Sequence, residues 1–225
     1  MDKLLTVVIP SYNVEKFLNQ TLDSFICDEA VMKKFEVIVV DDGSKDNTAK
    51  IGKEYADKYP DTFRVISKEN GGHGSTINCG IRNAVGKYFK VVDGDDWVNT
   101  ADFVKLVEDL EKTESEYVFT NYYEYYDDVN RQKAVDFPQF KDGTEYDFAD
   151  VANKVYIPMH ALVIKTSVLK DNNIVIDEKC FYVDVEYVMF PVPFVNKVTF
   201  FDLHVYMYRL CLLYTSPSPR DPKTS

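Results

Sequence analysis

Four short apolar runs, each followed by a more polar or amphipathic segment, dominate the first hundred residues of the chain. Their length and their branched or aromatic side chains predict β-strands at residues 4–10, 35–40, 63–67 and 87–92. Between the runs, apolar side chains recur at helical spacing, as in the stripe Leu18, Leu22, Phe25 and Ile26. Strands that alternate with helices favour an α/β fold with a mainly parallel central sheet flanked by helices.

Further elements are predicted by weaker patterns. Helical stripes follow Asn47, at Ile51 and Tyr55, and recur at Ile77, Ile81 and Ala84 and at Phe103, Leu106, Val107 and Leu110. In the less regular second half, strands are predicted within 116–128, at 160–165 and at 197–210, and a short helix at 183–190. Residues 128–150 are polar and predict a loop or hairpin, with a helix that starts near Asp147.

These elements predict a single domain over residues 1–210. A chain of 225 residues with 45% hydrophobic content is long enough to bury a sizeable core. The last fifteen residues, 211–225, contain three prolines and no periodicity, which is typical of a disordered tail. Residues 211–221 also match the translation of DNA that resembles a transposase sequencing adapter. We therefore predict a natural chain that is truncated near Leu210 and followed by a non-native or disordered tail.

Composition narrows the partners and the compartment. The 26 basic and 37 acidic residues give a formal net charge of −11, which disfavours a nucleic-acid partner and favours a small or neutral one. A polyanionic ligand would need a local counter-charge, such as a metal ion. The four cysteines lack paired spacing and predict reduced thiols in a cytoplasmic protein. No apolar run approaches the roughly 18 residues that cross a bilayer, so no transmembrane segment is predicted.

Three carboxylates crowd the end of the fourth predicted strand, in the sequence "KYFKVVDGDDW". Asp93, Asp95 and Asp96 lie within four positions, and Asp41 and Asp42 follow the second strand in the same way. Because the carboxyl ends of parallel strands meet at one edge of a sheet, we expect these side chains to gather there. Like charges so placed repel one another unless a cation neutralises them, and oxygen ligands favour Mg²⁺ or Mn²⁺. Turn propensity alone does not require three carboxylates in four residues.

Four motifs, in this order and spacing, resemble glycosyltransferase family 2. They are "VVIPSYN", "VIVVDDGSKDNT", "ENGGHGSTINCGIRNAVGKYFKVVDGDDW" and, more weakly, "YVDVEY". The resemblance covers residues 5–210 and implies an inverting enzyme with the nucleotide-sugar-binding fold called GT-A. A dinucleotide-binding dehydrogenase is disfavoured, since no GxGxxG sequence follows the first strand.

The resemblance also implies roles for individual residues. Asp93 and Asp95 would form the DxD motif that binds the donor diphosphate through Mg²⁺ or Mn²⁺, with Asp96 completing the metal-site residues. The first-strand loop and Asp41 would hold the base and ribose, and the glycine-rich loop would line the donor pocket. The substrate-binding residues implied in this way are Pro10, Ser11, Tyr12, Asn13, Asp41, Asp42, Asn70, Gly71, Gly74, Asn78, Asp93 and Trp97.

The catalytic base implied by the resemblance is Asp184, at the start of a predicted helix. The Glu-Asp pair of the family is Val183-Asp184 here, so Glu186 is a competing candidate and helix capping is the alternative role for Asp184. The donor loop also departs from the family pattern, because "GSTIN" carries no arginine before its asparagine. His160 is either an acceptor-side group or a structural histidine. Trp97 and the tyrosines at 122, 123, 125 and 126 either stack on sugar or pack in the fold.

The prediction is therefore a metal-dependent inverting glycosyltransferase that moves a sugar from a nucleotide-diphosphate donor, expected to be a UDP-sugar, to a hydroxyl acceptor. The family implies a saccharide or lipid-linked acceptor in bacterial surface polysaccharide or glycolipid synthesis, with peripheral membrane association left open. A sugar nucleotidyltransferase would instead carry a glycine-rich, basic loop after the first strand, where this chain has "PSYNVEK". An inactive sugar-nucleotide-binding module is the other alternative.

Overall fold

The structure, a computed structural model, describes residues 3–210. Its strands are β1 (Leu5–Ser11), β2 (Phe35–Asp41), β3 (Phe63–Ser67), β4 (Tyr88–Val91), β5 (Trp97–Val98), β6 (Tyr117–Tyr126), β7 (Arg131–Val135), β8 (Thr144–Asp147), β9 (Leu162–Lys165) and β10 (Lys197–Leu210). Its α-helices are α1 (Leu18–Asp23), α2 (Glu29–Met32), α3 (Thr48–Lys58), α4 (His73–Asn83), α5 (Thr100–Asp109), α6 (Phe148–Val151), α7 (Thr166–Asp171) and α8 (Val183–Met189). Short 3₁₀ turns are η1 (Leu110–Lys112), η2 (Asp127–Val129), η3 (Met159–Ala161) and η4 (Val192–Phe194).

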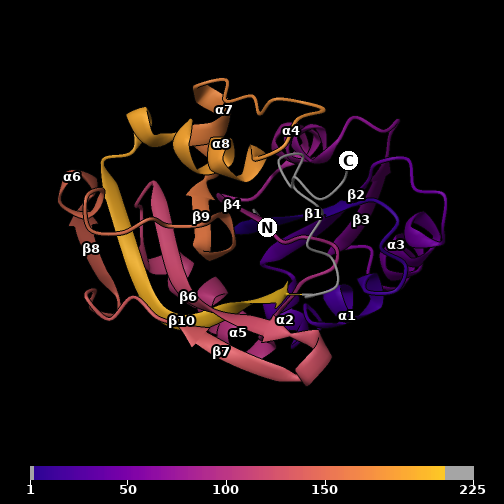
Figure 1. Ribbon diagram of the computed structural model, residues 1–225, viewed down its shortest axis with the longest axis horizontal. Helices are drawn as coiled ribbons and strands as arrows, with labels where there is room; N and C mark the ends of the chain where they lie inside the picture. Colours follow the sequence, from indigo (N-terminus) through magenta and orange to yellow (C-terminus); the bar gives the residue numbers. More distant parts are fainter. Residues whose placement is uncertain (1–2, 211–225) are drawn as a thin grey trace, which may run out of the picture.

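The strands form one curled, mixed sheet with helices on both faces (Figure 1). Their order is β3-β2-β1-β4-β9-β6-β10-β5, with β7 on β6 and β8 on β10. The first four strands pair in parallel, as do β6 and β10, whereas β9 runs antiparallel between β4 and β6. The predicted α/β class is confirmed. The predicted parallel arrangement describes the first half of the sheet, and the second half is mixed.

Two apolar clusters, one on each face of the sheet, account for the strongly hydrophobic strands. β1 and β2 are buried along their whole length, because helices cover both of their faces. Ile77 and Ile81 of α4 pack with Tyr187 of α8 on one face. Leu22 of α1 packs with Phe103 of α5 on the other. The stripes that predicted α1, α4 and α5 are therefore the buried sides of these helices.

The last strand, β10, closes the sheet over the carboxyl end of β4. It is 14 residues long and pairs with β6 through two register shifts, between Phe201 and His204 and between His204 and Tyr206. Such irregularities bend a strand and increase its twist. The bend brings the final residues of β10 against the loop that follows β4, where Asp93–Asp96 lie.

Most predicted elements lie where the patterns placed them, and the missed ones are short. The segment 128–150, predicted as a loop or hairpin, contains β7 and β8, which pair with β6 and β10 and so form no hairpin with each other. The helix expected near Asp147 is α6. The patterns missed α2, α7 and the two-residue strand β5, which are too short to show a period. Among residues 3–210, no helix is long and apolar enough to cross a membrane. The prediction of a foreign tail at 211–225 lies outside the described residues.

Candidate active site

The aspartate-rich loop after β4 holds its three carboxylates in different environments. Asp96 is 2% exposed, and its two oxygens accept hydrogen bonds from the Tyr206 hydroxyl at 2.6 Å and the Arg209 backbone N–H at 2.7 Å. Burial raises the pKa of Asp96 well above its ordinary value, and the charges of Asp93 and Asp95 raise it further. Asp96 is therefore turned into the protein, in a position that supports the loop.

Asp93 faces a histidine that the sequence did not single out. The Nε2 atom of His73, the first residue of α4, lies 2.7 Å from Asp93 Oδ1. Burial on its own would lower the pKa of His73, but the charge and hydrogen bond of Asp93 outweigh it and raise the pKa. The charges of Asp184 and Asp95 also raise the pKa of His73, so three carboxylates favour the protonated form of this imidazole.

Asp95 lies at the exposed edge of the same loop. Loss of solvent around its carboxylate and the negative charge of Asp93 raise the pKa of Asp95. The cost of ionising Asp95 beside another carboxylate is what a divalent cation would relieve. Asp93, Asp95 and Asp96 do not, however, bring three ligand atoms within 4.8 Å of one another. The arrangement fits Mg²⁺ or Mn²⁺ held by one or two carboxylates, with substrate phosphates and water completing the shell.

Arg209 fastens this loop to its surroundings. Its guanidinium donates hydrogen bonds to the Asp95 carbonyl at 2.7 Å, to Asp127 at 2.5 Å and to Gln20 at 2.6 Å. The same group lies 4.6 Å from the centre of the Trp97 ring, within the range of a cation–π contact. Trp97, predicted to contact substrate, thus packs under Arg209, and a sugar contact by its ring stays a prediction.

The two aspartates that follow β2, Asp41 and Asp42, have different hydrogen-bond partners. Asp42 is 2% exposed, and its carboxylate accepts hydrogen bonds from Lys68 Nζ at 2.6 Å, Gly71 N–H at 2.9 Å and Gly72 N–H at 2.8 Å. These bonds fix the start of the glycine-rich loop. Asp41, at the end of β2, accepts a hydrogen bond from the Ser44 N–H at 3.1 Å. Asp42 therefore shapes the predicted donor pocket through the loop that it holds.

The glycine-rich loop needs glycine because it runs against another backbone. A Cβ atom on Gly74 would lie 2.0 Å from the carbonyl oxygen of Asp177, and Gly72 has a φ of 84°. Asn78 holds the same segment, since its amide donates to the Ile176 carbonyl at 2.8 Å and accepts from the Ile176 N–H at 2.9 Å. Asn78 is thus buried between α4 and the segment that leads to α8. Its predicted contact with substrate is untested.

The other predicted donor-loop residues lie along the carboxyl ends of β1 and β2. Ser11 is buried at the end of β1, whereas Tyr12 is 48% exposed beside it. Asn13 has a φ of 54°, and its side chain accepts a hydrogen bond from the Lys45 N–H at 2.8 Å. The Asn70 side chain donates to the Asp42 carbonyl at 3.0 Å. The β1 and β2 loops are therefore joined, as a shared ligand site requires, and Pro10 belongs to buried β1.

A cavity of about 450 Å³ opens beside Asp93 and brings it together with the predicted base. Asp93 and His73 line one part of it, and Asp184 and His160 line another. Asp184 follows the first residue of α8, whose N-cap residue, Tyr182, makes no side-chain capping bond. Capping by Asp184 itself does not occur either, because no hydrogen bond joins its carboxylate to residues 3–210. The position of Asp184 is thus explained better by the cavity than by the helix.

Glu186, the competing candidate base, has a different environment. Its Oε2 atom accepts a hydrogen bond from the Asp177 N–H at 2.8 Å. Glu186, Asp177 and Cys180 bring their ligand atoms within 4.8 Å of one another at an exposed position. The residues that line the cavity include Asp184 and exclude Glu186. The geometry therefore favours Asp184 as the residue that faces a substrate.

His160 lies in the cavity wall among aromatic rings. It stacks on Tyr208 at 4.9 Å between ring centres, and its Nε2 atom is buried without a partner among the described residues. Burial and the charge of Lys90 lower the pKa of His160 to about 4, so the ring is neutral at pH 7. Lys90 is fully buried in β4 and donates to the His160 carbonyl at 2.8 Å. Burial lowers the pKa of Lys90 to about 7.

Sequence reasoning missed three residues of the site, His73, Tyr206 and Arg209. His73 was visible as the one histidine in the quoted "GGHGSTIN" segment. Tyr206 and Arg209 carried no such signal, because their approach to the loop depends on the bend in β10. Two of the β6 tyrosines predicted to stack on sugar pack against different histidines of the fold. Tyr122 packs edge-on against His160 at 4.1 Å, and Tyr123 stacks on His204.

Comparison with known proteins gives the family. The profile described as "Glycosyl transferase family 2" matches residues 6–172, so the chain belongs to this family. The uncharacterized glycosyltransferase EpsJ of Bacillus subtilis is 37% identical over 123 residues, which is 55% of this chain and 35% of EpsJ. This chain therefore spans about a third of the length of that relative.

Solved structures confirm the GT-A fold. S. aureus TarS 1–349 in complex with UDP-GlcNAc superposes with a TM-score of 0.77 at 24% identity, over 92% of this chain and 58% of that one. The mannosyltransferase PcManGT from Pyrobaculum calidifontis, in complex with GDP-Man and Mn²⁺, gives a TM-score of 0.66 at 18% identity, over 92% of this chain and 57% of that one.

Proposed function

We propose that the protein is a metal-dependent inverting glycosyltransferase that transfers a sugar from a nucleoside-diphosphate donor, with UDP as the expected nucleotide, to an acceptor hydroxyl. The observation that carries the proposal is the cavity of about 450 Å³ that contains both Asp93 and Asp184. An inverting displacement needs a leaving group held on one side of the anomeric carbon and a base on the other. The carboxylate of the aspartate-rich loop and that of α8 provide these two sides.

The leaving side is the aspartate-rich loop. Asp93 and Asp95 would hold Mg²⁺ or Mn²⁺, which offsets the charge that develops on the departing diphosphate. The hydrogen bond between His73 and Asp93 keeps that carboxylate oriented. Asp96 and Arg209 keep the loop in place from behind. A GT-A neighbour that contains Mn²⁺ supports a metal of this kind.

The attacking side is Asp184. Its carboxylate would accept the proton of the acceptor hydroxyl while the oxygen forms a bond to the anomeric carbon, and the bond from that carbon to the diphosphate oxygen breaks with its electron pair. One base is sufficient for this step. Glu186 is a weaker candidate because one of its oxygens is engaged by the Asp177 N–H. The Asp184 carboxylate carries no such bond from residues 3–210.

The test compares Asp184→Asn with Glu186→Gln. Donor binding is first measured by thermal shift over a panel of nucleotide sugars with and without Mn²⁺, since a ligand that binds only the folded state raises its stability. Asp184→Asn should keep donor affinity and lower transfer by about 10² to 10⁴ fold, the usual contribution of a general base. Glu186→Gln should stay within a few fold of the parent. The reverse result would assign the base to Glu186.

The same measurements distinguish the proposed glycosyltransferase from the alternative, an inactive sugar-nucleotide-binding module. A module of this kind would bind a donor but neither hydrolyse nor transfer it in any variant. The pathway that we propose is surface polysaccharide or glycolipid synthesis, with a saccharide or lipid-linked acceptor. We propose a cytoplasmic location at the inner face of the membrane, where such acceptors are presented.

A further inference from the structure

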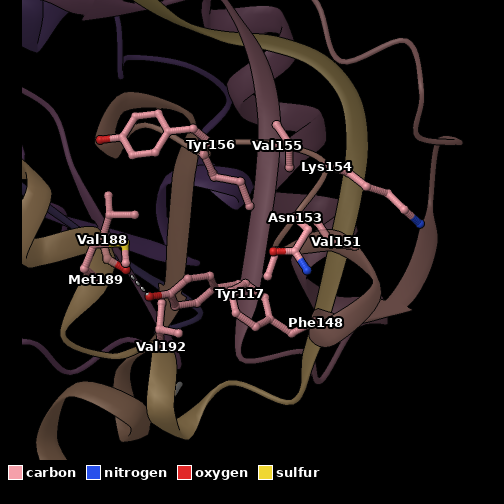
Figure 2. A pocket seen from close by; sticks show the side chains of 12 residues that line it. Tyr117, Phe148, Val151, Asn153, Lys154, Val155, Tyr156, Val188, Met189 and Val192 are labelled. Atoms are coloured by element: carbon pink, nitrogen blue, oxygen red, sulfur yellow. Dashed lines mark hydrogen bonds between the residues drawn. The ribbon is translucent and has the colours of Figure 1, made fainter.

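An apolar groove of about 550 Å³ lies beside the candidate active site. Its side chains come mainly from β6, α6, α8 and the segment before η3, and include Ile157. Figure 2 shows five others, Tyr117, Phe148, Val151, Val188 and Met189. The one hydroxyl among these six is used within the fold, because Tyr117 donates it to the Val188 carbonyl at 2.7 Å. These side chains therefore offer a ligand mainly hydrocarbon surface.

The groove adjoins the cavity that contains Asp184, because the two share a lining residue. Tyr156 lines both spaces and is 57% exposed. Helix α8 also joins them, because Asp184 faces the cavity and Val188, four residues later, lines the groove. At 1.5 Å per residue, these two positions are separated by about 6 Å along the helix.

Large apolar side chains in the linings of both spaces are exposed to solvent. Phe181 and Tyr182, which line the cavity, are 86% and 80% exposed, and Met189 in the groove is 50% exposed. Large apolar side chains grouped on a surface in this way mark a binding site. A soluble sugar needs none of them. A hydrocarbon chain that enters beside the base would cover them.

We propose that this groove binds the hydrocarbon chain of an amphipathic acceptor whose hydroxyl is presented to Asp184. The inference rests on the proposed function, because it names the class of acceptor for the same site. Specificity for the acceptor would then come in part from α6 and α8. The chain would bind along Tyr117, Val188 and Met189, and Tyr156 would lie at the junction between chain and sugar.

The probes are methyl, hexyl and octyl β-glucoside, used below their micelle concentrations and titrated by calorimetry. Each buried methylene contributes about 0.8 kcal/mol, so affinity should rise about fourfold per added carbon until the groove is full. Burial of hydrocarbon should also give a negative heat-capacity change that grows with chain length. Affinity that is independent of chain length would overturn the proposal.

Two variants locate the binding surface. Met189→Glu places a charge in the groove and should lower octyl glucoside affinity at least tenfold. Phe190→Glu is the matched control, because Phe190 is the next residue, is 42% exposed and does not line the groove. The affinity of Phe190→Glu for octyl glucoside should stay within twofold of that of the parent protein. Ala152→Trp, at an exposed lining position, narrows the groove without adding charge and should act like Met189→Glu.

The remaining outcomes separate this inference from the proposed function. Equal losses in Met189→Glu and Phe190→Glu would refute the groove. Equal sugar transfer to methyl and octyl glucosides would refute it while leaving the glycosyltransferase proposal intact. If Met189→Glu converted a dimer to a monomer without changing octyl glucoside affinity, the groove would be a self-association surface instead. Octyl glucoside binding without any nucleotide binding would overturn the proposed function, and the acceptor role with it.

Discussion

Replacing Tyr206 by phenylalanine removes a single hydroxyl from the middle of the candidate site. This hydroxyl donates to Asp96 at 2.6 Å and accepts from the Asp93 N–H at 3.1 Å, and Tyr206 is completely buried. Phenylalanine preserves the ring and its packing. The change therefore removes one of the two hydrogen bonds to the buried Asp96 carboxylate and the partner of the part-buried Asp93 N–H, and it creates no large cavity.

The size of the effect follows from these two bonds. A hydrogen bond to a charged or strongly polar buried group contributes about 1.5–3 kcal/mol, and water cannot enter a fully buried position to replace it. For a chain of this size each kcal/mol lowers the melting temperature by about 2–4 °C, so Tyr206→Phe should melt roughly 3–12 °C lower. Donor affinity in the presence of Mn²⁺ should fall as well, because the loop of Asp93 loses its support.

Thermal unfolding followed by circular dichroism measures the difference, with Tyr208→Phe as the control. Tyr208 lies on the same strand, and its hydroxyl makes no hydrogen bond to the part of the chain that the structure describes. The melting temperature of Tyr208→Phe should therefore stay close to that of the parent protein. If both variants melted within 1 °C of each other, the reasoning that β10 holds the aspartate loop through Tyr206 would be refuted.

Three further changes test other parts of the site. Arg209→Lys keeps the charge but loses the fork that reaches Gln20, and should weaken Mn²⁺-dependent UDP binding about tenfold or more by calorimetry, while secondary structure by circular dichroism stays unchanged. Gly74→Ala places a Cβ against the Asp177 carbonyl, and denaturant unfolding should show a loss of about 1–3 kcal/mol. His160 has a pKa of about 4 in the fold and an ordinary value of 6.5, so the unfolded chain binds the extra proton between them. Stability should fall as the pH drops from 6.5 to 4, and His160→Phe should reduce this slope in pH-dependent melting curves.

The local parts of the fold could be predicted from the sequence because each element carries its own pattern. β1 and β2 read as continuous apolar runs since helices cover both of their faces, and α5 shows its stripe because only one side packs on the sheet. The antiparallel insertion of β9 between β4 and β6 left no trace of this kind. Strand order depends on contacts between segments far apart in the sequence. The hydrophobic periodicity of each segment carries no information about these contacts.

The candidate site likewise has a part that was visible in the sequence and a part that depends on the fold. The crowding of Asp93, Asp95 and Asp96 was visible in four consecutive positions, and the structure then gives the carboxylates of Asp93 and Asp96 different partners, His73 and Tyr206. That Asp96 turns inward could not be read from the motif. Its partners are Tyr206 and the Arg209 backbone, more than a hundred residues later, and both depend on the two register shifts in β10.

The charge balance of the site explains why those late residues matter. Asp93, Asp95 and Asp184 all raise the pKa of His73 through their charges, and His73 and the Arg209 guanidinium in turn lower the pKa of Asp95. Arg209 neutralises the back of the loop and leaves the carboxylates at the front for a cation. A chain that lost this arginine would keep the same DxD sequence but would allow Asp95 to turn away. In this protein the geometry of the motif depends on β10, which holds the loop from behind.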